Sequence, residues 1–186
     1  MNQYSMIKYE IASYLHRLKI HVINNRSEYP SYLTDDAIMG ITIHFDDNVD
    51  STLLSSGITG LCLKDGLSRE WTGTKENDML ISLSAICVEA DDAKKTREAV
   101  MKSIITHEFM HSISVGFAVE NNSKESYYKD EAYTDHLAQK LFNKLCTSEF
   151  YYTPYPSLRI NEYSMVNITD EGIQCYFKGK INRPMK

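Results

Sequence analysis

The sequence lacks several features that would assign it to a special class of protein. No apolar run reaches the roughly 18 residues of a membrane span, and residues 1–20 lack the uninterrupted apolar core of a secretory signal. Charge of one sign does not dominate, because 20 Lys and Arg stand against 25 Asp and Glu, for a net charge of −5. Nucleic-acid binders usually carry a basic face. We therefore expect no membrane span and no nucleic-acid partner.

The same absence of a signal leads us to expect a protein that is cytoplasmic as synthesised, with signal-independent secretion or delivery to a host cell left open. Closely spaced cysteines are also absent, and no Cys-x-x-Cys pair occurs among the four (Cys62, Cys87, Cys146 and Cys175). Structural zinc sites normally use close-spaced thiolates, so these cysteines do not predict one. Their apolar sequence context predicts four small buried side chains.

The chain of 186 residues, with 42% hydrophobic and 24% charged residues, is typical of one globular domain. Neither an internal repeat nor a low-complexity linker divides it, so we expect a single domain over residues 1–186. Hydrophobic spacing predicts helices over 3–18, 93–115 and 127–146. Asp91 or Asp92 is the expected N-cap of the second helix, and Gly116 its expected stop.

Alternating hydrophobicity predicts strands over 38–45, 57–64, 80–88, 165–169 and 173–178. Asp170-Glu171-Gly172 indicates a hairpin turn between the last two. The segments 24–36 and 120–126 are expected to be loops, and 64–77 is expected to be a long loop or a hairpin. The Tyr- and Pro-rich stretch 150–156 is expected to be either a packed surface loop or a cleft wall. These elements together predict an α+β fold.

One short motif carries the chemistry, His107-Glu108-Phe109-Met110-His111. Residues i and i+4 lie on one helical face, one turn apart, so the two imidazoles can converge on one ion. Glu108 is rotated away from the pair and is placed to hold a metal-activated water. Two histidines and a general base in this order are the zinc motif of metalloproteases.

A catalytic zinc ion needs a third protein ligand and one open position. The remaining histidines are His16, His21, His44 and His136. The strongest downstream candidate is Glu131 in a second helix. Asp135 lies one turn further on the same face and can accept the spare ring N–H of a ligand histidine. Ala138, one turn on again, lets two helices approach closely. Two imidazoles and a carboxylate suit zinc.

The patterns His107-Glu108-x-x-His111 and Glu131-x-x-x-Asp135-x-x-Ala138 resemble the gluzincin group of zinc metallopeptidases. The resemblance implies a zincin-like domain, with a mixed β-sheet packed on an active-site helix and a helix that bears the glutamate ligand. It also implies an edge strand that aligns the peptide substrate, for which 80–88 is the candidate. The chain also resembles some small bacterial effector metallopeptidases, which act on one or a few host proteins.

The expected activity is a zinc-dependent endopeptidase with one catalytic Zn²⁺, a metal-activated water and Glu108 as general base, acting on a protein or peptide. The alternative is a narrow-specificity regulatory or effector zincin that cleaves or only binds one protein partner. A further donor normally stabilises the oxyanion. The sequence leaves seven candidates for it: Tyr127, Tyr128, His136, Tyr152, Tyr155, Arg159 and Tyr163.

Overall fold

The computed structural model describes residues 3–45, 58–64, 73–117, 124–153 and 166–179. Within these ranges it contains six α-helices and a small sheet of three strands, so the prediction of a mixed α+β fold is confirmed. The elements in chain order are α1 (Gln3–Asn24), α2 (Asp35–Gly40), β1 (Ile43–Phe45), β2 (Gly60–Cys62), β3 (Met79–Ile81), α4 (Leu83–Asp92), α5 (Arg97–Ser112), α6 (Lys124–Leu145) and α8 (Asp170–Lys178).

The sheet has the order β1–β3–β2, with β1 parallel and β2 antiparallel to β3. Two backbone hydrogen bonds show which residues of β2 and its flanking positions face β3. Leu63 donates its N–H to the Asp78 carbonyl (2.8 Å), and Ser82 donates its N–H to the Thr59 carbonyl (3.0 Å). Alternate residues of a strand direct their backbone groups to opposite edges. The backbone groups of Gly60 and Cys62 therefore point to the outer edge of β2.

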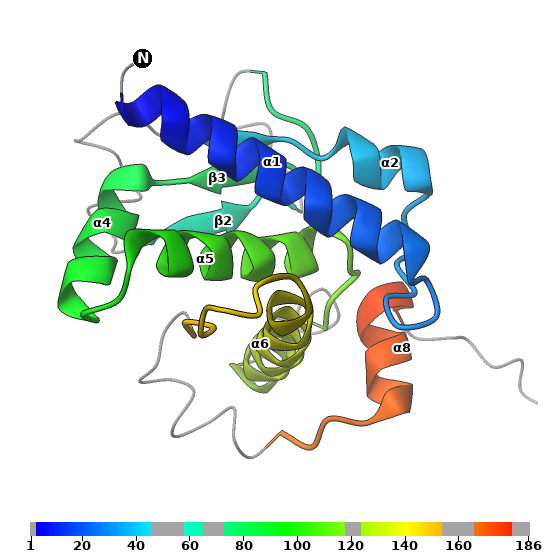
Figure 1. Ribbon diagram of the computed structural model, residues 1–186. Helices are drawn as coiled ribbons and strands as arrows, with labels where there is room; N and C mark the ends of the chain where they lie inside the picture. The colour runs from blue at the N-terminus through cyan, green and yellow to red at the C-terminus, as the bar shows by residue number, and fades with distance from the viewer. Residues whose placement is uncertain (1–2, 46–57, 65–72, 118–123, 154–165, 180–186) are drawn as a thin grey trace, which may run out of the picture.

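Helix α5 is the central element. Its residues 103–110 are buried without interruption, because α1, β2 and β3 pack against it as well as α4 and α6. Figure 1 shows α5 lying between the sheet with α1 and the end-on helix α6. A helix covered on every side places its polar side chains in the interior, and α5 does so with His107 and Glu108.

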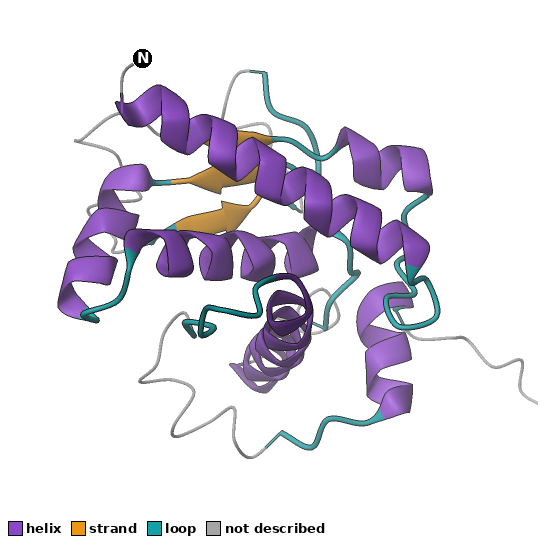
Figure 2. Cartoon of the chain, in the orientation of Figure 1, coloured by secondary structure: helices purple, strands orange, loops and turns teal. Residues whose placement is uncertain are grey.

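One apolar core joins all six helices, and α8 closes it with two fully buried rings, Tyr176 and Phe177. Tyr176 stacks on Tyr133 of α6 (ring centroids 6.2 Å apart), and Phe177 meets Tyr29 edge to face (6.4 Å). In Figure 2, α8 stands beside α6. The end of the described chain therefore packs against the helix that carries Glu131.

Two predicted strand segments are helical, and both predictions were wrong for the same reason. The predicted strand 80–88 ends as β3 at Ile81, and Ser82 caps α4 by accepting the N–H of Ala85 (3.3 Å). The hairpin turn predicted at 170–172 and the strand predicted after it over 173–178 together form α8. Thr169 caps that helix by accepting the N–H of Gly172 (3.0 Å). A hydroxyl in front of a helix satisfies a free amide of its first turn.

Other element boundaries also differ from the predictions. Asp35 and Ile38 belong to α2, so the strand predicted over 38–45 is confined to Ile43–Phe45. Asp91 and Asp92 end α4, and Thr96 is the N-cap of α5.

Three further predicted elements differ only in their ends. The first predicted helix extends to Asn24, the third predicted helix begins at Lys124, and the second predicted strand is confined to Gly60–Cys62. Residues 57, 65–72, 120–123, 154–156 and 165 lie outside the described residues.

Two smaller expectations concern the burial of the cysteines and the absence of a membrane span. Cys62 and Cys146 are buried as predicted, whereas Cys87 and Cys175 are partly exposed, and all four are free thiols. Among the described helices, none is long and apolar enough to cross a membrane.

Candidate metal centre

Three side chains from two helices meet in the interior: His107 and His111 of α5, and Glu131 of α6. Nε2 of His107 lies 3.1 Å from Oε2 of Glu131, and Nε2 of His111 lies 3.3 Å from Oε1 of the same carboxylate. One ligand atom from each residue lies within 4.8 Å of the others. His107 and Glu131 are buried, and His111 is slightly exposed. This group can hold a metal ion.

The spacing suits a small tetrahedral cation. Zinc–nitrogen and zinc–oxygen bonds of about 2.0–2.1 Å at tetrahedral angles put neighbouring ligand atoms roughly 3.3–3.4 Å apart. The distances from His107 and His111 to the Glu131 carboxylate, 3.1 and 3.3 Å, run to its two different oxygens, and each fits the spacing of one pair of ligand atoms. Two imidazole nitrogens and a carboxylate are also an ordinary donor set for zinc. The three predicted ligand residues are therefore brought together in a group that can hold a metal ion.

Glu108 lies on the same helix but faces a different neighbour, β2. Its carboxylate accepts the N–H of Cys62 at the outer edge of that strand. Gly60 makes this approach feasible, because a Cβ at that position would lie 2.8 Å from Cγ of Glu108. Burial raises the pKa of Glu108, and the histidine charges oppose that shift. A carboxyl group with a raised pKa is better matched to proton transfer near neutral pH.

Asp130 is the carboxylate that contacts a candidate ligand histidine. Its Oδ2 lies 3.3 Å from Nδ1 of His111, and its Oδ1 accepts the N–H of Phe117 (2.7 Å). Burial lowers the pKa of His111, but the charges and hydrogen bonds of Glu131 and Asp130 outweigh it, and the pKa is raised well above its usual value. Sequence reasoning missed Asp130, although it directly precedes Glu131.

Asp135, expected to orient a ligand histidine, is buried on α6. Its role toward such a histidine stays a prediction. In the described part of the chain, Nδ1 of His107 is buried and makes no hydrogen bond. The small residue Ala138 is fully buried.

The remaining histidines do not join this group. His44 contacts Asp78 through Nε2 (2.8 Å) at the sheet, His16 and His21 belong to α1, and His136 is exposed on α6. Over the described residues, the His107, His111 and Glu131 group is the cluster with metal-binding geometry.

The candidates for an oxyanion donor are separated by the structure. The Tyr152 hydroxyl donates to Glu89 of α4, and the Tyr128 ring lies under the Lys124 ammonium (5.1 Å). Burial and then the charges of Glu131, Glu108 and Asp130 raise the pKa of Tyr127 to about 12. Among the described tyrosine candidates, Tyr127 is the one whose pKa is raised by the charge of Glu131 in the metal-binding group. The others, Tyr155, Arg159 and Tyr163, lie outside the described residues.

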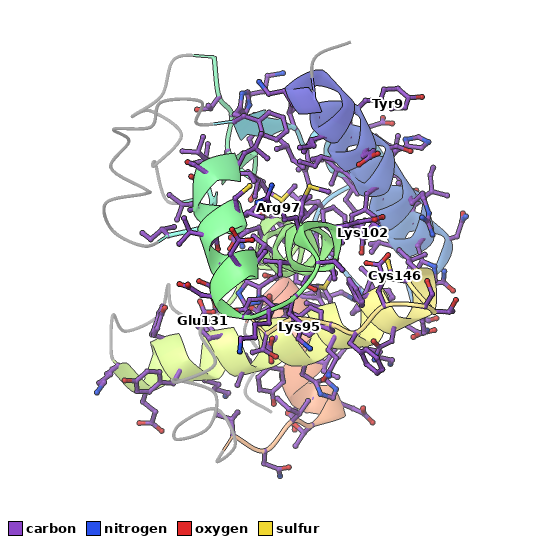
Figure 3. The ribbon with its side chains drawn as sticks, turned by 60° about the vertical axis from the view of Figure 1, so that its left-hand side comes forward. Tyr9, Lys95, Arg97, Lys102, Glu131 and Cys146 are labelled. Carbon is purple, nitrogen blue, oxygen red and sulfur yellow. The ribbon has the colours of Figure 1, made fainter. Side chains whose placement is uncertain are left out.

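Figure 3 shows Glu131 reaching from α6 toward the α5 helix, which is seen end-on. Because α5 and α6 pack against each other, Glu131 lies beside His107 and His111. Comparison of the chain with protein-family models, with curated proteins and with solved structures gives no match.

Proposed function

We propose that this chain is a zinc-dependent endopeptidase of the gluzincin type. The observation that supports it most is the convergence of ligand atoms of His107, His111 and Glu131 within 4.8 Å of one another, with a second acidic side chain, Glu108, directed to the adjacent edge strand. A glutamate next to a metal-binding group, but outside it, is the arrangement that hydrolysis by a general base requires.

Each residue has a defined task in this proposal. His107, His111 and Glu131 hold the ion, which when bound lowers the pKa of a coordinated water and polarises the scissile carbonyl. Glu108 takes a proton from the attacking water at its carboxylate and passes it to the leaving amine. Burial of Glu108 keeps bulk water from competing for that proton. Asp130 holds the His111 ring from behind.

The outer edge of β2 is the proposed docking edge for an extended peptide. The resemblance to gluzincins implies such an edge strand, and 80–88, its predicted position, does not form one. The backbone groups of Gly60 point to that edge, and the Cys62 N–H there meets the Glu108 carboxylate. Because the Cys62 N–H is bonded to Glu108, a peptide that pairs with β2 would use the backbone groups of Gly60 and would pass beside the general base.

Tyr127 is the proposed oxyanion donor. With a pKa of about 12 the hydroxyl is protonated at neutral pH, as that of an ordinary tyrosine is, and can donate to developing negative charge. Its position at the start of α6, one turn before Glu131, leaves the side chain 44% exposed and accessible to substrate.

The test is cleavage of casein and of a peptide library by the zinc-loaded protein, beside Glu108→Gln and the matched variant Glu98→Gln. Glu98 lies exposed at the start of the same helix. We expect Glu108→Gln to keep its zinc and to lose roughly 10²- to 10⁴-fold in rate, the usual contribution of a general base. Glu98→Gln should cleave at the wild-type rate.

Three outcomes would contradict the proposal. Equal cleavage by wild type and Glu108→Gln would remove the general base from the mechanism. Zinc binding without cleavage of any library member would favour the alternative, a regulatory or effector zincin confined to one protein partner. No metal binding at all would reject both.

A further inference from the structure

A buried polar cluster lies behind His111, on the side away from Glu131. Its members are His111, Ser114, Asp130, Thr134 and Tyr176, and we call it the His111 support cluster. The Thr134 hydroxyl lies 2.6 Å from the Tyr176 hydroxyl and 3.4 Å from Nδ1 of His111. Tyr176 belongs to α8, which contributes no residue to the His107, His111 and Glu131 group.

The direction of these hydrogen bonds follows from the number of protons. Thr134 has one hydroxyl proton and donates it to the Asp130 carbonyl, one turn earlier in α6 (2.8 Å). The Tyr176 hydroxyl must then be the donor to Thr134. Thr134 is left as an acceptor toward Nδ1 of His111. An acceptor there favours the tautomer that carries its proton on Nδ1 and its lone pair on Nε2, the nitrogen that faces Glu131.

Asp130 supports the same tautomer from a second direction, since its Oδ2 lies 3.3 Å from Nδ1 of His111. The segment that follows α5 is tied to α8 as well. Gly116 donates its N–H to the Tyr176 carbonyl (2.9 Å), and the Ser114 hydroxyl donates to the His111 carbonyl (3.1 Å). Tyr176 thus holds the segment after α5 through its carbonyl and reaches the His111 ring through the Thr134 hydroxyl.

The Tyr176 side chain is well suited to a fixed role. It is fully buried and packs against Tyr133 and Phe117 (ring centroids 6.2 and 6.0 Å away). Burial raises the pKa of its hydroxyl well above the usual value, so the proton that it donates is retained at all physiological pH values. A donor held by packing on three elements can fix an acceptor in one orientation.

We propose that Tyr176 is a positioning residue for the metal site, acting through the Thr134 hydroxyl to hold the His111 ring with Nε2 toward Glu131. Helix α8 thereby sets the metal affinity of a site to which it supplies no ligand. The inference rests on the proposed metal-binding function of His107, His111 and Glu131. Loss of an outer hydrogen-bond partner of a metal ligand typically weakens metal binding about 10- to 100-fold.

The test uses four single variants and one double variant of the full chain. Tyr176→Phe removes one hydroxyl and keeps the ring. Thr134→Val removes the Thr134 hydroxyl that links Tyr176 to His111, and Thr134→Ser keeps a hydroxyl at that position. Tyr133→Phe is the matched control, because Tyr133 is equally buried and adjacent, but its hydroxyl contacts Asn167 and Thr169 rather than Thr134. The measurements are the zinc Kd by chelator competition and the d–d absorption spectrum of the Co²⁺-loaded protein.

We expect Tyr176→Phe and Thr134→Val each to weaken zinc binding about 10- to 100-fold and to change the Co²⁺ spectrum. Thr134→Ser and Tyr133→Phe should match the wild type. The double variant Tyr176→Phe/Thr134→Val should be no weaker than Thr134→Val alone, because both changes remove the same relay. Circular dichroism and thermal unfolding identify any variant that loses its fold.

Wild-type zinc affinity in a folded Tyr176→Phe would overturn the inference, and so would an equal loss in Tyr133→Phe, which would trace the effect to packing. The proposed function fails separately. If zinc binds and responds to Tyr176→Phe while no peptide is cleaved, the positioning role stands and the peptidase does not. If the wild type binds no metal, both fall.

Discussion

Gly60 of β2 lies so close to Glu108 of α5 that a Cβ on Gly60 would stand 2.8 Å from Cγ of Glu108. It would also stand 2.9 Å from Cγ2 of Ile104. Real Cβ atoms essentially never come within 3.0 Å of a neighbour. The absence of a side chain at this one position of β2 therefore lets the edge strand rest on the helix that carries the candidate general base.

Gly60→Ala should accordingly lower peptide hydrolysis while zinc stays bound. The added methyl pushes β2 and Glu108 apart, and a displacement of about 1 Å at a reacting group can reduce rate about 10²-fold. Overpacking should also lower the free energy of unfolding by about 1–3 kcal/mol. Kinetics, zinc content and urea unfolding measure these effects. Gly40→Ala is the control, because nothing lies within 4 Å of its position; equal loss in both variants would contradict the account.

Gly116→Ala should weaken metal binding through Asp130. Gly116 has φ +78, and a Cβ there would lie 2.6 Å from Oδ1 of Asp130, the carboxylate that supports His111. The positive φ alone destabilises a non-glycine residue by about 1–3 kcal/mol.

Gly73→Ala separates the two effects. Gly73 has φ +85 with nothing within 4 Å, so it carries the backbone strain without the clash. Both variants should unfold at lower urea concentration, but zinc Kd should rise in Gly116→Ala alone. Unchanged zinc affinity in a folded Gly116→Ala would show that Asp130 does not support the site.

Zinc binding should release a proton at neutral pH. The pKa of His111 in the metal-free protein is raised well above 6.5, because Glu131 and Asp130 outweigh the opposite effect of burial. A ring with a raised pKa keeps its second proton to higher pH than a free imidazole does, and it must lose that proton to bind a metal. Apparent affinity therefore rises with pH until the folded-state pKa of His111 is passed, and falls as the pH is lowered.

Titration calorimetry in buffers of different ionisation enthalpy measures this proton. Asp130→Asn removes one of the charges that raise the pKa of His111 and should release fewer protons at the same pH. A binding enthalpy that is independent of buffer in the wild type would contradict a protonated His111.

Tyr127→Phe should reduce kcat without changing zinc affinity. The loss of one donor to a developing oxyanion typically lowers kcat about 10²- to 10³-fold. Tyr128→Phe is the neighbouring control, since the Tyr128 ring lies against Lys124. Steady-state kinetics on one cleaved peptide would decide; similar kcat values for Tyr127→Phe and wild type would return the role to the other candidates.

The metal-binding group was predictable because its information is local. His107 and His111 share a helical face whatever surrounds the helix, and the sequence also placed Glu131 in the second helix. The rest of the site depends on which elements pack together. The contact of Asp130 with Nδ1 of His111 depends on the packing of α6 against α5, and Tyr176 reaches the site because α8 packs on α6.

The two segments wrongly predicted as strands are preceded by helix N-caps, which their hydrophobic pattern does not reveal. The stretch 83–88 alternates like a strand, but Ser82 offers a hydroxyl to the amide of Ala85 and begins a helix. Thr169 followed by two acidic residues is likewise typical of a helix start. Acidic residues before a glycine also occur in hairpin turns, which is why the sequence alone favoured a hairpin there.

The most direct test is the zinc content and zinc Kd of the wild-type chain, beside His111→Ala, Glu131→Ala and the control His136→Ala, by native mass spectrometry and chelator competition. His136 is an exposed histidine of α6 outside the metal-binding group. The account predicts about one zinc ion per chain for the wild type and His136→Ala, and a large loss of affinity in the other two. Metal-free wild-type protein, or wild-type affinity in His111→Ala and Glu131→Ala, would contradict it.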